Sequence, residues 1–148
     1  MKKNYLIKSG VYNPTTRYSR HSLYYLINDL DPNTVQENLA NKHVAVLGCG
    51  GIGNLVATNL ATLGVGKITL IDGDVIEVSN LGRQIVYCQE DVGSKKTDIL
   101  KREIGKRNSN CEIEVIDNYV SKDSLSKMSP EPDMMILSAD SLGLISDV

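Results

Sequence analysis

The chain has 148 residues, a formal net charge of −2 at pH 7, and neither Phe nor Trp. This length predicts one domain that buries about 68–70% of the surface of the unfolded chain. The small negative charge argues against a nucleic-acid partner, and no apolar stretch is long enough for a signal peptide or a membrane span. The cysteines, Cys49, Cys88 and Cys111, form no C-x-x-C pair, which predicts a reducing, cytoplasmic setting.

Residues 1–42 are expected to form an N-terminal arm that carries two helices. The first 16 residues contain several turn formers and predict an irregular segment. A short helix is predicted from Arg17, and Asp31-Pro32 offers an N-cap and a first-turn proline for a second helix. Because both helices precede the first strand, we expect them to pack on the outside of the sheet.

The stretch from residue 43 to Asp72 predicts a strand, a glycine turn, a helix and a second strand. Residues 43–47 are a short apolar run, typical of a strand buried on both faces. Apolar residues then recur at helical spacing, and Gly64 stands where a helix C-cap favours a positive φ. The second apolar run ends at Asp72.

The turn between the first strand and the helix predicts a nucleotide site. It contains Gly48, Gly50, Gly51 and Gly53, of which three make the G-x-G-x-x-G pattern. Such a turn brings backbone N–H groups and a helix N-terminus close to an anion. Asp72 follows Gly53 by 72 − 53 = 19 residues, near the position of the acid that binds ribose hydroxyls. The alternative is a turn that only packs helix against strand.

Further polar residues follow the second strand and could complete this site. These are Asp74 at the strand end and, in one tight loop, Asn80, Arg83 and Gln84. Lys95 and Lys96 fall in the first turn of the next predicted helix, where they oppose the helix dipole. A polyphosphate lying across that helix start would stabilise both lysines; the alternative is that they are simply solvated.

The remaining elements predict an α/β fold. Residues 111–116 alternate like a strand near a sheet edge, residues 121–127 form a short helix, and residues 134–137 form another apolar strand. Asp140 follows that strand and suits either a hydrated Mg²⁺ on nucleotide phosphates or a helix N-cap, and the two roles are compatible. We therefore expect residues 43–148 to form a Rossmann-like, mostly parallel sheet with helices on both faces.

Six motifs in order make the sequence resemble a known superfamily: RYSRH, GCGGIG, LIDGD, SNLGRQ, DVGSKK and SAD. In this order they resemble the ubiquitin-activating superfamily, including its ThiF, MoeB and HesA members, and above all the branch that adenylates the microcin C peptide. The resemblance covers roughly residues 17–140. It implies that this sequence corresponds to the N-terminal half of the family's domain. The zinc site that is common in the family is missing, because its cysteine pairs are absent from this sequence.

The resemblance implies ATP-dependent adenylation of the C-terminal carboxylate of a peptide or small carrier protein, with release of pyrophosphate. ATP would lie with its phosphates over the glycine turn and its ribose on Asp72. The family motifs put Asn80, Arg83 and Lys96 on the phosphates, Gln84 in support of the loop, and Asp140 on Mg²⁺. The attacking carboxylate is already ionised at neutral pH, so the reaction needs no base from the protein.

The resemblance also implies a homodimer. On spacing alone, Arg17 and Arg20 share a helix face and would be read as solvated. Arg20, however, matches an arginine that family dimers insert into the ATP site of the neighbouring subunit. The implied catalytic residues are therefore Arg20, Arg83, Lys96 and Asp140.

Two other functions fit parts of the pattern. The glycine turn and Asp72 alone would equally suit an NAD(P)-dependent oxidoreductase, which gives no reason for Arg83, Lys96 and Asp140 to meet at one crevice. A non-catalytic nucleotide-binding or assembly module would retain the site without turnover.

Overall fold

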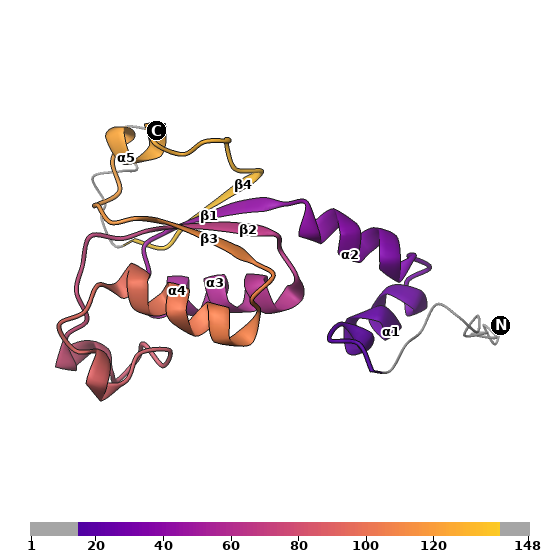
Figure 1. Cartoon of the computed structure of the whole chain (residues 1–148), viewed down its shortest axis with the longest axis horizontal. Helices are drawn as coiled ribbons and strands as arrows, with labels where there is room; N and C mark the ends of the chain where they lie inside the picture. The colour runs from indigo at the N-terminus through magenta and orange to yellow at the C-terminus, as the bar shows by residue number, and fades with distance from the viewer. Residues whose placement is uncertain (1–14, 140–148) are drawn as a thin grey trace.

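A four-stranded parallel sheet forms the centre of the computed structural model, which describes residues 15–139 (Figure 1). Its strands are β1 (His43–Leu47), β2 (Lys67–Ile71), β3 (Glu112–Ile116) and β4 (Met134–Leu137), in the order β3-β2-β1-β4. All three pairings are parallel, so the carboxyl ends of the strands meet at one edge. The predicted Rossmann-like parallel sheet is confirmed.

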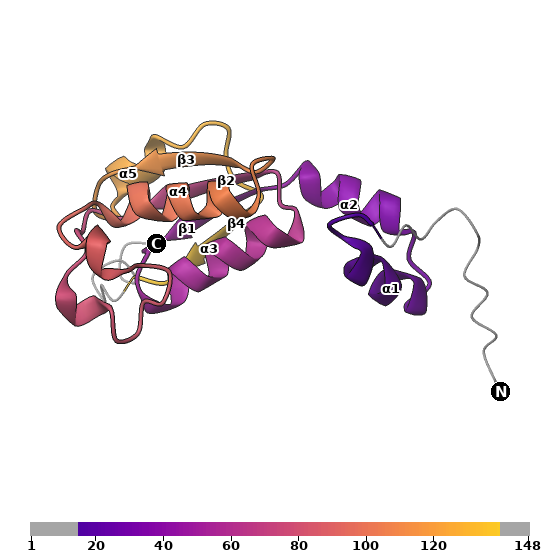
Figure 2. The ribbon, with the colours of Figure 1, turned by 60° about the horizontal axis from the view of Figure 1, so that its bottom comes forward.

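Helices cover both faces of this sheet, but unequally. On one face α3 (Gly51–Leu63) and α4 (Lys96–Arg107) pack against each other, and on the other lies the short α5 (Lys122–Ser126) (Figures 1 and 2). The larger core fills the space under the first pair, with buried side chains that include Val46, Ile68, Leu70, Ala57, Ala61, Leu100 and Ile104. A smaller cluster on the α5 side contains Ala45, Leu47 and Ile71. The prediction of helices on both faces is confirmed.

The two N-terminal helices form as the sequence predicts. They are α1 (Ser19–Ile27) and α2 (Pro32–Ala40). The Asp31 carboxylate accepts a hydrogen bond from the Thr34 N–H at 2.8 Å and so caps α2, with proline in its first turn. This carboxylate satisfies one of the N–H groups that a helix start leaves without an intrahelical partner.

The position of these helices differs from the expectation that they pack on the outside of the sheet. They lie beyond the amino ends of the strands (Figure 1), because α2 leads almost directly into β1. There the Tyr18 hydroxyl accepts a hydrogen bond from Asn108 Nδ2 at 3.3 Å, and Gln36 Nε2 donates to the Leu63 carbonyl at 3.0 Å. The pair therefore packs against the carboxyl ends of α3 and α4.

β4 forms at the apolar run where the sequence predicts a strand, but most of its side chains are exposed. Met134, Met135 and Leu137 are 58%, 57% and 49% exposed. In the described sheet β4 pairs only with β1. Among residues 15–139 β4 lies at an edge of the sheet, a position that an apolar run in sequence cannot reveal. No helix in residues 15–139 is both long and apolar enough to cross a membrane.

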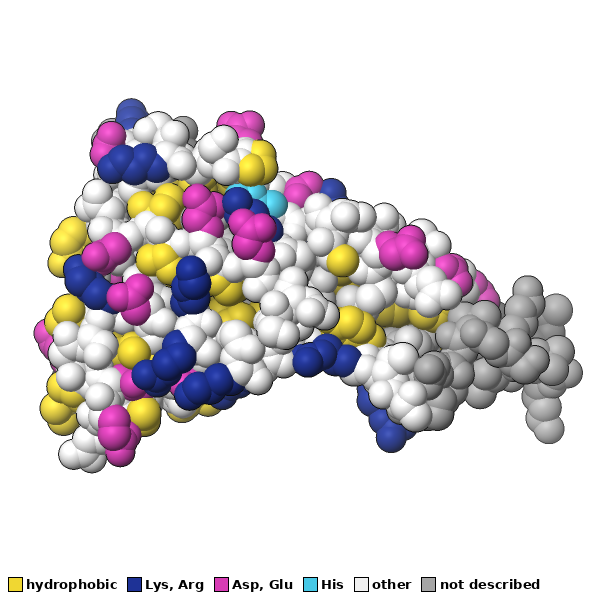
Figure 3. All heavy atoms as spheres, in the orientation of Figure 1, with side chains coloured by type: hydrophobic (Ala, Val, Ile, Leu, Met, Phe, Trp, Pro, Cys, Tyr) yellow, Lys and Arg dark blue, Asp and Glu magenta, His cyan; other side chains and the backbone are white. Residues whose placement is uncertain are grey.

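The surface over α4 gathers several Lys and Arg side chains (Figure 3). They surround Glu103, which accepts hydrogen bonds from Lys106 at 2.7 Å and Arg102 at 3.0 Å, and pairs with Arg107 at 3.2 Å. Chiefly through the Lys106 bond, these cations lower the pKa of Glu103 to about 2. The helix therefore carries its basic charge around an ionised carboxylate.

Glu103→Gln should destabilise the fold relative to the unaltered chain, and this loss of stability should be larger at pH 7 than at low pH. The folded pKa lies below the ordinary value, so ionised Glu103 stabilises the fold above about pH 4.5, and this stabilisation is lost as the pH falls toward 2. Urea unfolding of both proteins at pH 7, 5 and 3 measures the gap between their free energies of unfolding. This gap should narrow as the pH falls. Asp123→Asn breaks the exposed Asp123–Lys127 pair and should show little gap at any pH. A gap for Glu103→Gln that is the same at all three pH values contradicts the prediction.

Candidate functional site

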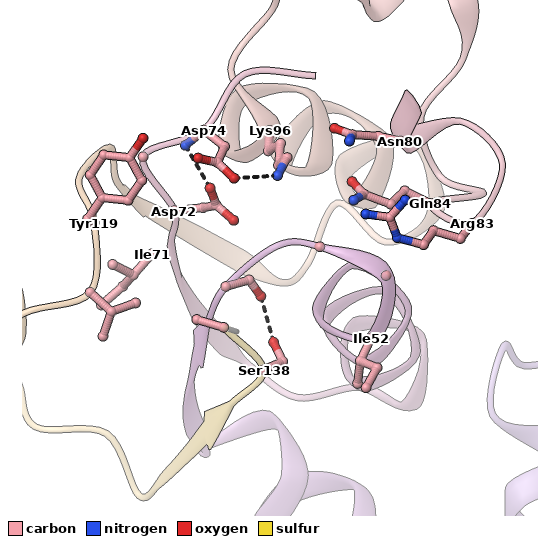
Figure 4. Close-up of a pocket in the computed structure, with 16 residues that line it drawn as sticks. Ile52, Ile71, Asp72, Asp74, Asn80, Arg83, Gln84, Lys96, Tyr119 and Ser138 are labelled. Atoms are coloured by element: carbon pink, nitrogen blue, oxygen red, sulfur yellow. Dashed lines mark hydrogen bonds and ion pairs between the residues drawn. The ribbon is translucent and has the colours of Figure 1, made fainter. Parts of the chain in front are cut away.

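A cavity of about 670 Å³ opens at the carboxyl edge of the sheet (Figure 4). Nine of the ten residues predicted to bind a nucleotide line it: Gly48, Gly50, Gly51, Asp72, Asp74, Asn80, Arg83, Gln84 and Lys96. They come from the ends of β1 and β2, the start of α3, the β2–α4 connection and the start of α4. Its volume and its position at the carboxyl ends of parallel strands are those of a small-molecule site in an α/β fold.

The glycine turn requires glycine at Gly48. Its φ is +95°, and an added Cβ would lie 2.7 Å from the backbone nitrogen of Ala139. Ser138 Oγ, at the end of β4, donates to the Gly48 carbonyl at 2.7 Å. Glycine is therefore the residue that lets the ends of β1 and β4 approach this closely.

α3 starts at the cavity without a capping side chain. Gly50 is its N-cap and Gly51 its first residue, and both line the cavity. An uncapped helix start presents backbone N–H groups and a partial positive charge, which suits an anion.

Gly53, the tenth predicted binding residue, does not line the cavity. It is buried beneath the turn, where a Cβ would overlap the Gly48 carbonyl oxygen. Its glycine is explained by the close packing of α3 under the turn, which the G-x-G-x-x-G pattern also requires.

Asp72 ties the end of β2 to the glycine turn. One carboxylate oxygen accepts the Cys49 N–H at 2.6 Å, and the other accepts the Asp74 N–H at 2.8 Å. Asp72 is 8% exposed yet lines the cavity, and each carboxylate oxygen can accept more than one hydrogen bond. The carboxylate can thus hold the turn and still accept a hydroxyl.

The two lysines at the start of α4 each have a carboxylate partner. Lys96 Nζ lies 2.7 Å from Asp74, and Lys95 Nζ lies 2.8 Å from Asp117. These carboxylates offset the unfavourable helix dipole. The lysines differ in burial, because the Lys96 side chain is 7% exposed and the Lys95 side chain is 43% exposed. Lys96 alone of the two lines the cavity (Figure 4).

The loop between β2 and α4 places three polar side chains on the cavity wall. The Asn80 side chain caps a short 3-10 helix, Val78–Asn80, by accepting the Glu77 N–H at 3.1 Å. The exposed Arg83 donates to the Ser79 carbonyl at 3.2 Å. Gln84 is 3% exposed, and its Oε1 has no hydrogen-bond partner among the described residues. An unpartnered buried amide on the wall is poised for a ligand.

Arg20 and Asp140 fall outside this cluster. Arg20 is exposed on α1, which lies beyond the amino ends of the strands, and it does not line the cavity of its own chain. Asp140 lies outside the described residues, directly after Ala139, which lines the cavity. The described residues contain no cluster of three or more metal-ligating side chains. The Mg²⁺ role of Asp140 stays a prediction.

Two tyrosines near the turn were missed in the sequence. Tyr119 lines the cavity beside Gly73, where a Cβ would lie 2.9 Å from the Tyr119 nitrogen. Tyr87 is buried, and its hydroxyl donates to the Cys49 carbonyl at 2.7 Å. Neither belongs to a recognisable motif, and only the folded chain brings them to the site.

None of the three cysteines is a thiolate at neutral pH. Burial raises the pKa of Cys49, and burial raises the pKa of Cys111 to about 11. The exposed Cys88 donates its thiol to Asp91 at 2.9 Å, which raises its pKa to about 11. The site therefore contains no activated cysteine nucleophile.

Solved structures and curated proteins resemble this chain over most of its length. E. coli MccB in complex with ATP superposes with a TM-score of 0.84 at 43% identity, over 93% of this chain and 42% of MccB. MccB has also been solved with AMPCPP and MccA, with the same TM-score of 0.84 and 45% identity over 93% of this chain and 41% of MccB.

Among curated proteins, a probable molybdopterin-synthase adenylyltransferase from Porphyra purpurea is 33% identical over 89% of this chain and 34% of its own length. The SAMP-activating enzyme E1 of Haloferax volcanii is 30% identical over 90% of this chain and 50% of its own length. The chain thus spans half or less of these relatives. Residues 18–148 match the ThiF family, and the chain belongs to that family.

Proposed function

We propose that the protein adenylates the C-terminal carboxylate of a peptide or small carrier protein with ATP. One observation carries this proposal: Lys96, Arg83 and the uncapped start of α3 line one cavity, together with Asp72. Two cations and a helix N-terminus suit a triphosphate. The names of the relatives, adenylyltransferases and an E1 activating enzyme, support the same chemistry.

In this proposal the phosphates and the ribose each contact a defined part of the cavity. The glycine turn and α3 hold the phosphates, and Asp72 accepts the ribose hydroxyls. Asn80, Arg83 and Lys96 contact the phosphate oxygens. The substrate carboxylate attacks the α-phosphorus, the bond to the bridging oxygen of pyrophosphate breaks, and acyl-AMP forms. Negative charge builds on the leaving pyrophosphate, where cations held in advance stabilise the transition state.

Gln84 completes the wall, and Asp140 is proposed to bind Mg²⁺. When bound, Mg²⁺ would neutralise phosphate charge.

Residues 1–42 are the proposed arm and residues 43–148 the proposed ATP-binding domain. The three unpaired cysteines fit the proposed cytoplasmic location.

Titration with ATP–Mg²⁺ and with NAD tests the nucleotide. We expect saturable ATP binding at least tenfold tighter than NAD binding, because the cations line the cavity around the glycine turn. Tighter NAD binding would favour the oxidoreductase. Pyrophosphate release on addition of candidate peptides then separates an adenylating enzyme from a module that binds the nucleotide without turnover.

We also propose that Arg20 acts in the ATP site of a partner subunit in a homodimer. Its exposure on α1, away from the cavity of its own chain, fits a contact in trans. Arg20→Ala and Asp140→Ala chains should each lose pyrophosphate exchange. When they are mixed, one site of each hybrid dimer regains both residues and activity returns to about a quarter of the unaltered level for random pairing. No recovery at any mixing ratio rules out a trans-acting arginine.

A further inference from the structure

We propose that Tyr87 is a positioning residue that aims the Gly50 N–H of the glycine turn at the nucleotide phosphates. The inference rests on the proposed function only for the identity of the ligand. Tyr87 lies in the β2–α4 connection, far from the turn in sequence, and is 4% exposed. Its hydroxyl donates to the Cys49 carbonyl at 2.7 Å.

The hydrogen bond acts through the peptide group that joins Cys49 to Gly50. In a planar trans peptide the carbonyl and the following N–H point in opposite directions. Because the Cys49 carbonyl points at the buried Tyr87 hydroxyl, the Gly50 N–H is turned to the other side, and Gly50 lines the cavity. No acceptor among the described residues bonds this N–H. It is therefore free to donate to a ligand.

The hydrogen bonds on the N-terminal side of Cys49 do not fix the orientation of the peptide group that joins Cys49 to Gly50. The Cys49 N–H is held by Asp72 at 2.6 Å, and the Gly48 carbonyl is held by Ser138 Oγ at 2.7 Å. Each fixes the peptide on the N-terminal side of Cys49, whereas Tyr87 fixes the peptide on its C-terminal side. Burial raises the pKa of Tyr87 above its ordinary value, so its phenol is a donor at neutral pH.

Tyr87→Phe removes the donor and keeps the ring. We expect the affinity for ATP and for inorganic pyrophosphate to fall about five- to tenfold, the effect of one hydrogen bond, while the affinity for adenosine stays unchanged. Calorimetric titration of the full chain gives all three affinities. The ¹H–¹⁵N resonance of Gly50 should shift, and its further shift with pyrophosphate should shrink.

Tyr18→Phe is the matched control. It also removes one tyrosine hydroxyl from a hydrogen bond, that with Asn108 at 3.3 Å, but at the opposite end of the sheet. Thermal unfolding shows how much each substitution costs the fold, and Tyr18→Phe should leave all three affinities unchanged.

Equal losses for ATP and adenosine, or no loss for pyrophosphate, overturn the positioning role. A different outcome refutes the proposed function. If the unaltered chain binds pyrophosphate but not ATP, ATP use is refuted, and the pyrophosphate affinity of Tyr87→Phe alone tests the positioning role. An unaltered chain that binds neither refutes both.

Discussion

Lys96→Ala should lower the affinity for ATP by about 100-fold or more and abolish ATP-dependent turnover. The Lys96 ammonium is the most buried cation on the cavity wall, and a hydrogen-bonded pair of a buried cation with phosphate is worth several kcal/mol. The fold should survive, because its partner Asp74 is 48% exposed and regains water when the lysine is removed. Calorimetric titration with ATP–Mg²⁺ and pyrophosphate exchange measure the two losses.

Lys95→Ala provides the control within the same helix turn. Lys95 has the same charge and also pairs with a carboxylate, Asp117 at 2.8 Å, but it is exposed and does not line the cavity. Its removal should change the affinity for ATP less than about fivefold, because the interactions of an exposed, screened charge are worth about 0.2–1 kcal/mol. Similar losses for the two variants would mean that the local charge matters and that the position of Lys96 does not.

Gly53→Ala should destabilise the fold by about 2 kcal/mol or more and remove nucleotide binding. The added methyl group would overlap the Gly48 carbonyl oxygen, a backbone atom that moves only if α3 shifts away from the turn. Overpacking of this kind costs about 1–3 kcal/mol and more against a fixed backbone, which exceeds the gain of about 1 kcal/mol from replacing a helical glycine. Urea unfolding measures the loss.

Gly105→Ala is the matched substitution in α4. Apart from the adjacent residues and the backbone of α4 itself, no atom of residues 15–139 lies within 4 Å of a Cβ at Gly105. Only the helix propensity remains, so this variant should be more stable by about 0.5–1 kcal/mol. Changes of opposite sign in the free energy of unfolding for the two variants would separate the effect of packing from that of helix propensity. A stable Gly53→Ala variant would mean that α3 is not held against the turn as described.

The strands and the helix of the nucleotide motif are predictable because their signals are local. The apolar run of β1, the glycine turn and the C-cap at Gly64, whose φ is +103°, each depend on a few adjacent residues. The N-cap at Asp31 is local in the same sense. For the same reason the positions of Asn80, Arg83 and Lys96 on one wall follow from the order of the elements, since all come after the carboxyl end of one strand.

The remaining features depend on contacts between distant parts of the chain. Nothing near Tyr87 in sequence predicts that its hydroxyl reaches Cys49, and nothing near Met134 predicts an exposed edge. The pairing of Lys96 with Asp74 was also not foreseen. The position of α1 and α2 beyond the strand ends depends on side-chain contacts with the ends of α3 and α4, such as that of Tyr18 with Asn108.

The bond from Ser138 to the Gly48 carbonyl has a consequence for synthesis on the ribosome. The two residues are separated by 90 positions, and Ser138 N–H also donates to the Leu47 carbonyl at 2.8 Å. A nascent chain that has released its glycine motif but not β4 lacks both restraints. We expect nucleotide to protect the nascent chain from protease only when the chain is long enough for β4 to have left the exit tunnel. The order of translation thus lets the signature motif emerge well before the cavity can mature.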